Sequence, residues 1–131
     1  MRRAASASPV SWGFPRSGSN FPGVGLVALD GQDLTALNGG PIFKFTEAIS
    51  LVVNCETQEE VDHFWTKLSA GGQEVQCGWL KDKFGISWQV VPIALMEMLG
   101  DKDPARSQRV MAAMLKMKKI DIEPLRRAYA G

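Results

Sequence analysis

Residues 77–92, CGWLKDKFGISWQVVP, decide how the rest of the chain must fold. Aromatic and β-branched residues, which favour strands, dominate both halves of this stretch. Between the halves, residues 82–85 (DKFG) predict a turn, because Gly85 readily takes the positive φ that a tight turn requires. We therefore predict a β-hairpin with arms over 77–81 and 86–91.

The second arm has two chemically different faces, because successive side chains of a strand point to opposite sides of the sheet. One side receives Ile86, Trp88 and Val90 and is suited to a core. The other side holds the amide of Gln89 between a serine and a valine. This second side is suited to the wall of a pocket.

Length and charge bound the class of protein. A chain of 131 residues is expected to form one domain with a core of its own. The net charge of +1 gives no reason to expect nucleic acid or a membrane surface as a partner. No apolar run reaches the roughly eighteen residues of a spanning helix, and the N-terminus lacks the apolar segment of a secretion signal. We therefore expect a cytoplasmic protein.

Cysteine and histidine, the residues that most often bind transition metals or act as nucleophiles, are few in this chain. Cys55 and Cys77 lie apart, without CxxC or metal-ligand spacing, and we interpret them as reduced, mostly buried thiols. The single histidine, His63, lies off the apolar side of a predicted helix and is interpreted as a surface side chain.

The N-terminal part of the chain is divided in two. Residues 1–23 are rich in Ser, Pro, Gly and Arg without hydrophobic periodicity, and we predict a disordered or non-native segment. Residues 24–37 predict a further hairpin, with Asp30-Gly31 at its turn.

Residues 42–92 predict the order β-α-β-β-β. The nearly continuous apolar run at 48–54 (AISLVVN) predicts a strand buried on both faces. Thr57 and Glu60 form a capping box at the start of a helix. Apolar residues then recur at helical spacing, at Val61, Phe64, Trp65 and Leu68. A short strand near residues 74–75 leads into the hairpin.

Three helices are predicted after the hairpin, over 93–99, 104–118 and 123–130. Asp103 followed by Pro104 is a favourable start for the second of them. This helix has a methionine-rich apolar side, which we interpret as core or subunit-contact packing, made of Val110, Met111, Met114, Leu115 and Met117.

The two predicted hairpins also resemble each other. Aligning Gly31 with Gly85 places Thr35 on Gln89, and each hairpin is followed by a proline. Repetition of one unit is what a paired-module architecture requires. Only the closing hairpin of the first unit is recognisable, so we predict that the first module is incomplete.

Several blocks of sequence carry a resemblance to a known family. They are ALNGGP at 36–41, FKFTEAISLVVNCETQEEVD at 43–62, LSAGG at 68–72, the stretch 77–92 and RVMAAMLKMKKIDI at 109–122. With them the chain closely resembles, over residues 24–128, the PhnB-like branch of the vicinal-oxygen-chelate superfamily. That superfamily includes glyoxalase I and the bleomycin-resistance proteins, and the branch is often labelled 3-demethylubiquinone 3-methyltransferase.

The resemblance implies an α+β fold in which two β-α-β-β-β modules curl into a half-barrel around one cavity, usually within a homodimer. It divides a glyoxalase-like domain, residues 24–131, into three parts. These are a remnant of the first module at 24–41, the second module at 42–92 and C-terminal helices at 93–131.

The resemblance does not extend to a metal centre. In metal-using relatives the first and last strands of each module supply four ligands, typically His, Glu or Gln. The matching positions here hold Gln89, Thr35 and Ala48, or Glu47 with a one-residue shift. Because this set is poor for zinc or manganese, we expect no metal and no other cofactor.

The methyltransferase label finds no support in the sequence. Neither glycine pair, at 39–40 and 71–72, has the context of a loop that cradles a nucleotide between a strand and a helix. Whether the protein is an enzyme therefore stays open.

Three functions compete. The first, which we favour, is metal-free binding of a small organic molecule. The residues expected to bind it are Thr35, Leu37, Glu47, Cys77, Trp79, Ser87 and Gln89. The second is a metal-dependent lyase, isomerase or dioxygenase completed by a dimer partner, with Glu47 as the candidate base. The third is a non-functional truncated copy.

Overall fold

The computed structural model describes residues 24–131, so the segment 1–23 predicted to be disordered lies outside the described residues. The described chain divides into two units, one ending at Phe43 and the other comprising Lys44–Gly131.

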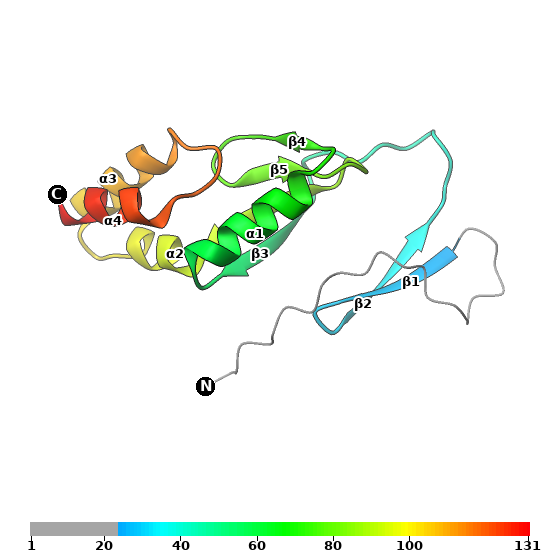
Figure 1. Ribbon diagram of the computed structural model, residues 1–131, viewed down its shortest axis with the longest axis horizontal. Coiled ribbons are helices and arrows are strands. Elements are labelled where there is room, and N and C mark those ends of the chain that lie inside the picture. Colours follow the sequence, from blue (N-terminus) through cyan, green and yellow to red (C-terminus); the bar gives the residue numbers. More distant parts are fainter. Residues whose placement is uncertain (1–23) are drawn as a thin grey trace. The chain divides into compact units, whose positions relative to one another are not determined.

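The first unit holds the predicted N-terminal hairpin. Strands β1 (Val24–Leu29) and β2 (Gln32–Leu37) pair antiparallel, with Val24 opposite Leu37 (Figure 1). Asp30 and Gly31 both take positive φ angles, 46° and 77°. Two consecutive positive φ angles define the tight turn that matches the twist of paired strands, which confirms this prediction.

The second unit is built on a four-stranded sheet with the strand order β3-β6-β5-β4. Its strands are β3 (Ser50–Cys55), β4 (Gln73–Glu74), β5 (Trp79–Lys81) and β6 (Ser87–Pro92). Strand β6 runs parallel to β3 and antiparallel to β5. Helix α1 (Gln58–Ser69) connects β3 to β4, so the predicted β-α-β-β-β order is confirmed.

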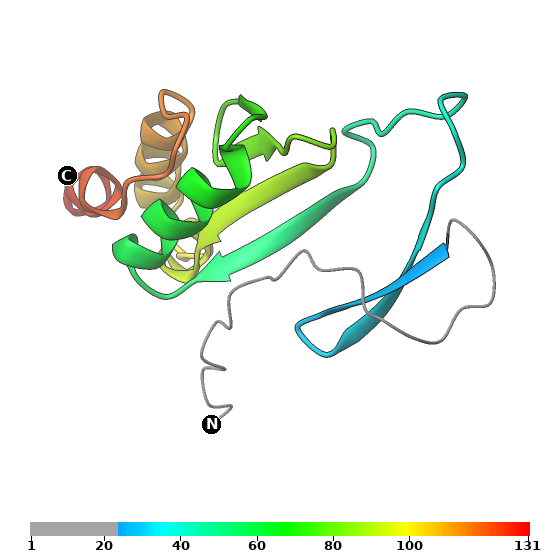
Figure 2. The same cartoon turned by 45° about the vertical axis from the view of Figure 1, so that its right-hand side comes forward.

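Helix α1 covers one face of this sheet (Figure 2). Thr57 Oγ1 accepts the N–H of Glu60 at 3.2 Å, as the capping box predicted. The carboxylate of Glu60 in turn accepts the N–H of Glu56 at 2.8 Å, one residue earlier than in the standard box. The helix buries Val61 and Trp65, and His63 is exposed, as predicted.

The prediction that the first strand of this unit is buried on both faces is wrong. Strand β3 lies at the edge of the sheet, and α1 covers one face of it. The side chain of Val52 on the other face is 52% exposed. Cys55, three residues later on the face that α1 covers, is fully buried, and burial raises the pKa of its thiol to about 11.

Three helices follow the sheet. They are α2 (Ile93–Leu99), α3 (Pro104–Met114) and α4 (Ile122–Ala130). They enclose a small core of their own, made of Leu95, Met98, Val110, Ile120 and Leu125. Asp103 caps α3 as predicted, with its carboxylate accepting the N–H of Ala105 at 2.9 Å. None of the helices within residues 24–131 is long and apolar enough to cross a membrane.

Helix α3 ends earlier than predicted. The carbonyls of Met117 and Lys118 accept the N–H groups of Cys77 and Gly78, at 2.8 and 2.7 Å. The chain must leave the helix to present these two carbonyls to the sheet. Of the predicted methionine-rich side, Met114 and Met117 pack on the helical core, whereas Met111 and Leu115 are exposed.

A polar junction joins α1 to the segment that precedes α4. The Gln58 amide donates to the carbonyl of Ile120 at 3.2 Å and accepts the N–H of Ile122 at 2.8 Å. Beside it, Lys119 Nζ lies 2.5 Å from the carboxylate of Asp62. The hydrogen bond from Lys119 lowers the pKa of the Asp62 carboxyl, assisted by the Gln58 amide.

Candidate functional site

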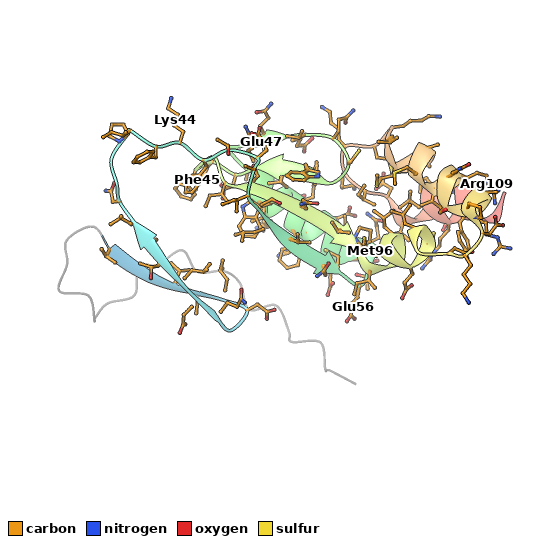
Figure 3. The ribbon with its side chains drawn as sticks, turned by 180° about the vertical axis from the view of Figure 1, so that it is seen from behind. Lys44, Phe45, Glu47, Glu56, Met96 and Arg109 are labelled. Carbon is orange, nitrogen blue, oxygen red and sulfur yellow. The ribbon has the colours of Figure 1, made fainter. Side chains whose placement is uncertain are left out.

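The face of the four-stranded sheet opposite α1 carries a mixed set of polar and apolar side chains. The pairing register assigns these residues to it: Ser50, Val52, Asn54, Trp79, Lys81, Ser87, Gln89 and Val91. We call this surface the open face. Figure 3 shows this unit from behind, with its strands in front of α1.

One row of the open face combines an aromatic, an amide and an aliphatic side chain. Gln89 is paired with Trp79 on β5 and with Val52 on β3. Directly opposed residues of paired strands point to the same face, so the three side chains lie side by side. The Gln89 amide donates to Ser50 Oγ at 2.8 Å, which fixes the amide in the plane of the face.

The adjacent row is polar. Ser87 is paired with Lys81 on β5 and with Ser50 on β3. Lys81 Nζ lies 2.5 Å from the carboxylate of Glu47, which belongs to the segment leading into β3. The hydrogen bond from Lys81 lowers the pKa of Glu47. Ser87 is 1% exposed, and its hydroxyl has no hydrogen-bond partner among the described residues.

The structure brings together some of the predicted site residues. Trp79, Ser87 and Gln89 share the open face, and Glu47 reaches it through Lys81. Thr35 and Leu37 belong to β2 of the other unit, where both are exposed and Leu37 is 71% exposed.

Cys77 lies where the sheet contacts the segment after α3, and it is not part of strand β5. Its φ is 58° and that of Gly78 is 81°, so β5 begins only at Trp79. The backbone of both residues is held by carbonyls of the segment after α3. Cys77 Sγ lies 3.7 Å from the carbonyl of Met114.

The donor set does not fit a metal ion. Glu47 is engaged with the ammonium of Lys81, and the amide nitrogen of Gln89 is engaged with Ser50. Residues 24–131 contain no group of three or more His, Cys, Asp or Glu side chains that could hold a metal ion. Serine and glutamine oxygens alone are weak ligands for zinc.

Sequence reasoning missed Lys81, Ser50 and Val52. Lys81 stands two positions after Trp79, so strand alternation alone assigns it to the same face. Ser50 and Val52 could be found only by recognising β3 as an edge strand.

A cavity of about 380 Å³ lies away from the open face. It opens at the N-terminal ends of α1 and α4, and it is lined by Glu56, Thr57, Gln58, Glu59, Ile122, Glu123 and Arg126. Gln58, which lines this cavity, is hydrogen-bonded to Ile120 and Ile122 and so connects α1 to the start of α4. We therefore assign this cavity a structural role.

Comparison with known proteins identifies the family. Residues 23–91, more than half of the chain, match the family described as 3-demethylubiquinone-9 3-methyltransferase. The chain belongs to this family. No protein with a curated description matches the chain.

Two solved structures are similar to this family member. The PhnB protein from Bacillus cereus, provisionally described as a 3-demethylubiquinone-9 3-methyltransferase, is 33% identical, with a TM-score of 0.50. That match covers 60% of this chain and 74% of the other. Protein PA1353 from Pseudomonas aeruginosa is 18% identical with a TM-score of 0.45, and the match covers 53% of this chain and 61% of the other.

The predicted PhnB-like resemblance and the α+β, glyoxalase-like fold are therefore confirmed. The family name alone assigns no reaction to this member. In residues 24–131, β3 leads into α1 through Glu56 and Thr57, and β6 leads directly into α2. Neither junction contains the glycine-rich turn that brings a backbone close to a nucleotide.

Proposed function

We propose that this protein binds a small organic molecule on the open face, without a metal ion. The row Trp79–Gln89–Val52 supports the proposal. An aromatic ring, an oriented amide and an aliphatic side chain placed together suit a planar ligand with one polar edge. The exposure of Val52 leaves apolar surface for such a ligand to cover.

Heteronuclear NMR tests this proposal on the intact chain. Small planar aromatic compounds, such as benzamide and indole, are titrated into ¹⁵N-labelled protein. The indole N–H of Trp79 and the side-chain amide of Gln89 are expected to shift. The indole of Trp65, which donates to Glu74 at 2.9 Å on the α1 side of the sheet, serves as the internal control. Shifts at Trp65 without shifts at Trp79 would contradict the proposal.

Elemental analysis separates this function from the metal-dependent lyase, isomerase or dioxygenase. We expect less than stoichiometric zinc, manganese or nickel in protein purified without chelators. A stoichiometric metal that is lost in a Glu47→Gln variant would favour the enzyme.

We also propose a homodimer in solution. Strand β3 lies at an edge of the sheet, and Ile49, directly before it, exposes apolar surface there. Sedimentation equilibrium should give the mass of a dimer for the wild type and of a monomer for Ile49→Lys. Val75→Lys, an exposed apolar position beside β4 at the opposite edge of the sheet, should leave the mass unchanged.

A further inference from the structure

We propose that Lys81 and Ser87 form a subsite for a carboxylate group of the bound molecule, and that Glu47 occupies this subsite in the free protein. This inference rests on the proposed function, because it assigns a chemical class to the ligand of the open face. In this proposal the Glu47 carboxylate takes the place of the ligand carboxylate until a ligand displaces it.

The path of the Glu47–Lys81 ion pair is the first observation. Glu47 precedes β3, Lys81 stands on β5, and β6 lies between these two strands (Figure 3). The ion pair therefore joins the segment that leads into β3 to β5, the two strands on either side of β6. Ser87 is the residue of β6 paired with Lys81, so it stands beside the Lys81 end of this ion pair.

The burial of Ser87 is the second, independent observation. Ser87 is 1% exposed on a face where Val52 is 52% exposed and Gln89 is partly exposed. Its pairing partner on β5 is Lys81, which carries the ion pair. The Ser87 hydroxyl has no partner among the residues described, although buried hydroxyl groups normally make a hydrogen bond.

The chemistry of the two groups matches a carboxylate. An ammonium and a hydroxyl are both hydrogen-bond donors, and charge-assisted hydrogen bonds to carboxylates are among the strongest in proteins. A ligand carboxylate seated between Lys81 and Ser87 would satisfy the Ser87 hydroxyl, which Glu47 leaves without a partner. The remainder of the ligand would lie over the adjacent row, against Trp79 and Gln89.

The segment that carries Glu47 is exposed to solvent. Residues 41–49 are all exposed and form no strand or helix. The Glu47 side chain is 60% exposed and that of Lys81 is 29% exposed. An ion pair this close to solvent contributes little net stability, so its exchange for a ligand carboxylate costs little. No core contact has to break when Glu47 leaves.

The test compares benzoate with benzamide, two planar probes that differ in charge. Binding to the full chain is followed by the NMR shifts of Trp79 and Gln89 at constant ionic strength. Benzoate is expected to bind more tightly than benzamide. Glu47→Gln removes the competing carboxylate and should raise benzoate affinity about two- to fivefold, the range of an exposed ion pair, and should change benzamide affinity less.

Two further variants test the subsite itself. Lys81→Gln should abolish the preference for benzoate. Ser87→Ala should lower benzoate affinity about tenfold, the effect of one hydrogen bond to a charged group. Both should lower benzamide affinity less than benzoate affinity, because benzamide carries no charge, and the NMR spectrum of each variant shows whether it is folded.

Glu59→Gln is the matched control, because it removes the same charge from an exposed position on α1. Equal gains in benzoate affinity for Glu47→Gln and Glu59→Gln would overturn the subsite. Equal binding of benzoate and benzamide at Trp79 would also overturn it and leave the proposed function standing. Shifts from neither probe would overturn both.

Discussion

Asp82 shows how much of a hairpin one side chain can determine. It is 7% exposed, and its Oδ1 accepts the N–H groups of Phe84 and Ile86, at 2.9 and 3.0 Å. Its Oδ2 accepts the indole N–H of Trp88 at 3.0 Å. One carboxylate therefore closes the turn and also fixes the orientation of a core tryptophan.

Replacing Asp82 should destabilise the fold. Asp82→Ala leaves three donors without their acceptor and should lower the free energy of unfolding by about 2–4 kcal/mol. Asp82→Asn should lower it less, because the amide oxygen can still accept the two backbone N–H groups. Urea denaturation measures both, with Lys83→Ala at the exposed next position as control. Equal urea midpoints for Asp82→Ala and Lys83→Ala would contradict this role of Asp82.

The sequence predicts this turn but not the role of Asp82 in it. A polar residue three positions before Gly85 is a local turn signal, and local signals are readable. The bond to Trp88 joins two side chains that become neighbours only when the strands have paired. Ser87 was assigned to the correct face by alternation, but the local pattern does not show that it is almost completely buried.

The connection between the sheet and the C-terminal helices depends on one glycine. Gly78 has a φ of 81°, and a Cβ atom at this position would lie 2.7 Å from the carbonyl oxygen of Val90. That carbonyl belongs to β6, and the N–H of Val90 donates to the carbonyl of Gly78 at 2.8 Å. The close approach is therefore part of the sheet itself.

Gly78→Ala should be strongly destabilising. It combines a left-handed backbone with a backbone clash, and we expect a loss of at least about 2 kcal/mol in the free energy of unfolding. Gly39→Ala is the matched control, because a Cβ atom there meets nothing within 4 Å. Thermal denaturation of the two variants should separate them, and an unchanged melting temperature for Gly78→Ala would contradict the geometry.

The junction between α1 and the segment before α4 should make stability depend on pH. Because Lys119 lowers the folded-state pKa of Asp62, folding favours the ionised form of this carboxyl. The stabilisation is complete above the pKa of the unfolded chain, about 4, and is lost as the pH falls through the lower folded-state pKa.

Asp62→Asn should therefore weaken the acid dependence of stability. Between about pH 4 and pH 2, the urea midpoint of this variant should fall less steeply than that of the wild type. Asp33→Asn changes an exposed position of β2, and the urea midpoint of this variant should fall as steeply as that of the wild type. Parallel curves for Asp62→Asn and the wild type would show that the ion pair with Lys119 does not contribute.

At the level of elements, periodicity and capping predicted most of the secondary structure. The helix after Thr57 and the order of the second module followed from local patterns. The sequence overestimated the burial of β3, because an apolar run does not reveal whether a strand is central or at an edge. The predicted helix 104–118 is longer than α3 because the carbonyls of Met117 and Lys118 accept hydrogen bonds from Cys77 and Gly78, which stand forty residues earlier in the chain.

For the whole molecule, the two units differ in how much apolar surface they bury. The second unit has fully buried residues in both its sheet and its helices, among them Leu80, Val90 and Leu125. In the first unit, every residue of β2 is exposed. An isolated two-stranded hairpin is marginally stable in water, so the two units should differ in local stability.

Hydrogen exchange on the intact chain tests this difference. Backbone amides of β1 and β2 should exchange orders of magnitude faster than those of Leu80 and Val90, because opening the hairpin uncovers little buried surface. Equal protection of β2 and β6 would show that the hairpin is covered by a further surface in solution, such as that of a second copy.

The candidate site was only partly predictable at this scale. Trp79, Ser87 and Gln89 share one face because alternation within a single hairpin places them there. Thr35 and Leu37 were grouped with them by the family resemblance, and they belong to a different unit. Residues of one hairpin can be placed by local pattern, whereas residues of two units cannot.

The two cysteines differ in a way that makes the protein convenient to study. With a pKa of about 11, the Cys55 thiol is ionised at neutral pH in only about one molecule in ten thousand, and it is fully buried. Cys77 is partly exposed at the seam between the sheet and the helices. A maleimide-linked fluorophore or spin label should therefore attach at Cys77 alone in the native chain. Such a probe would report on the contact between the sheet and the helices without any engineered residue.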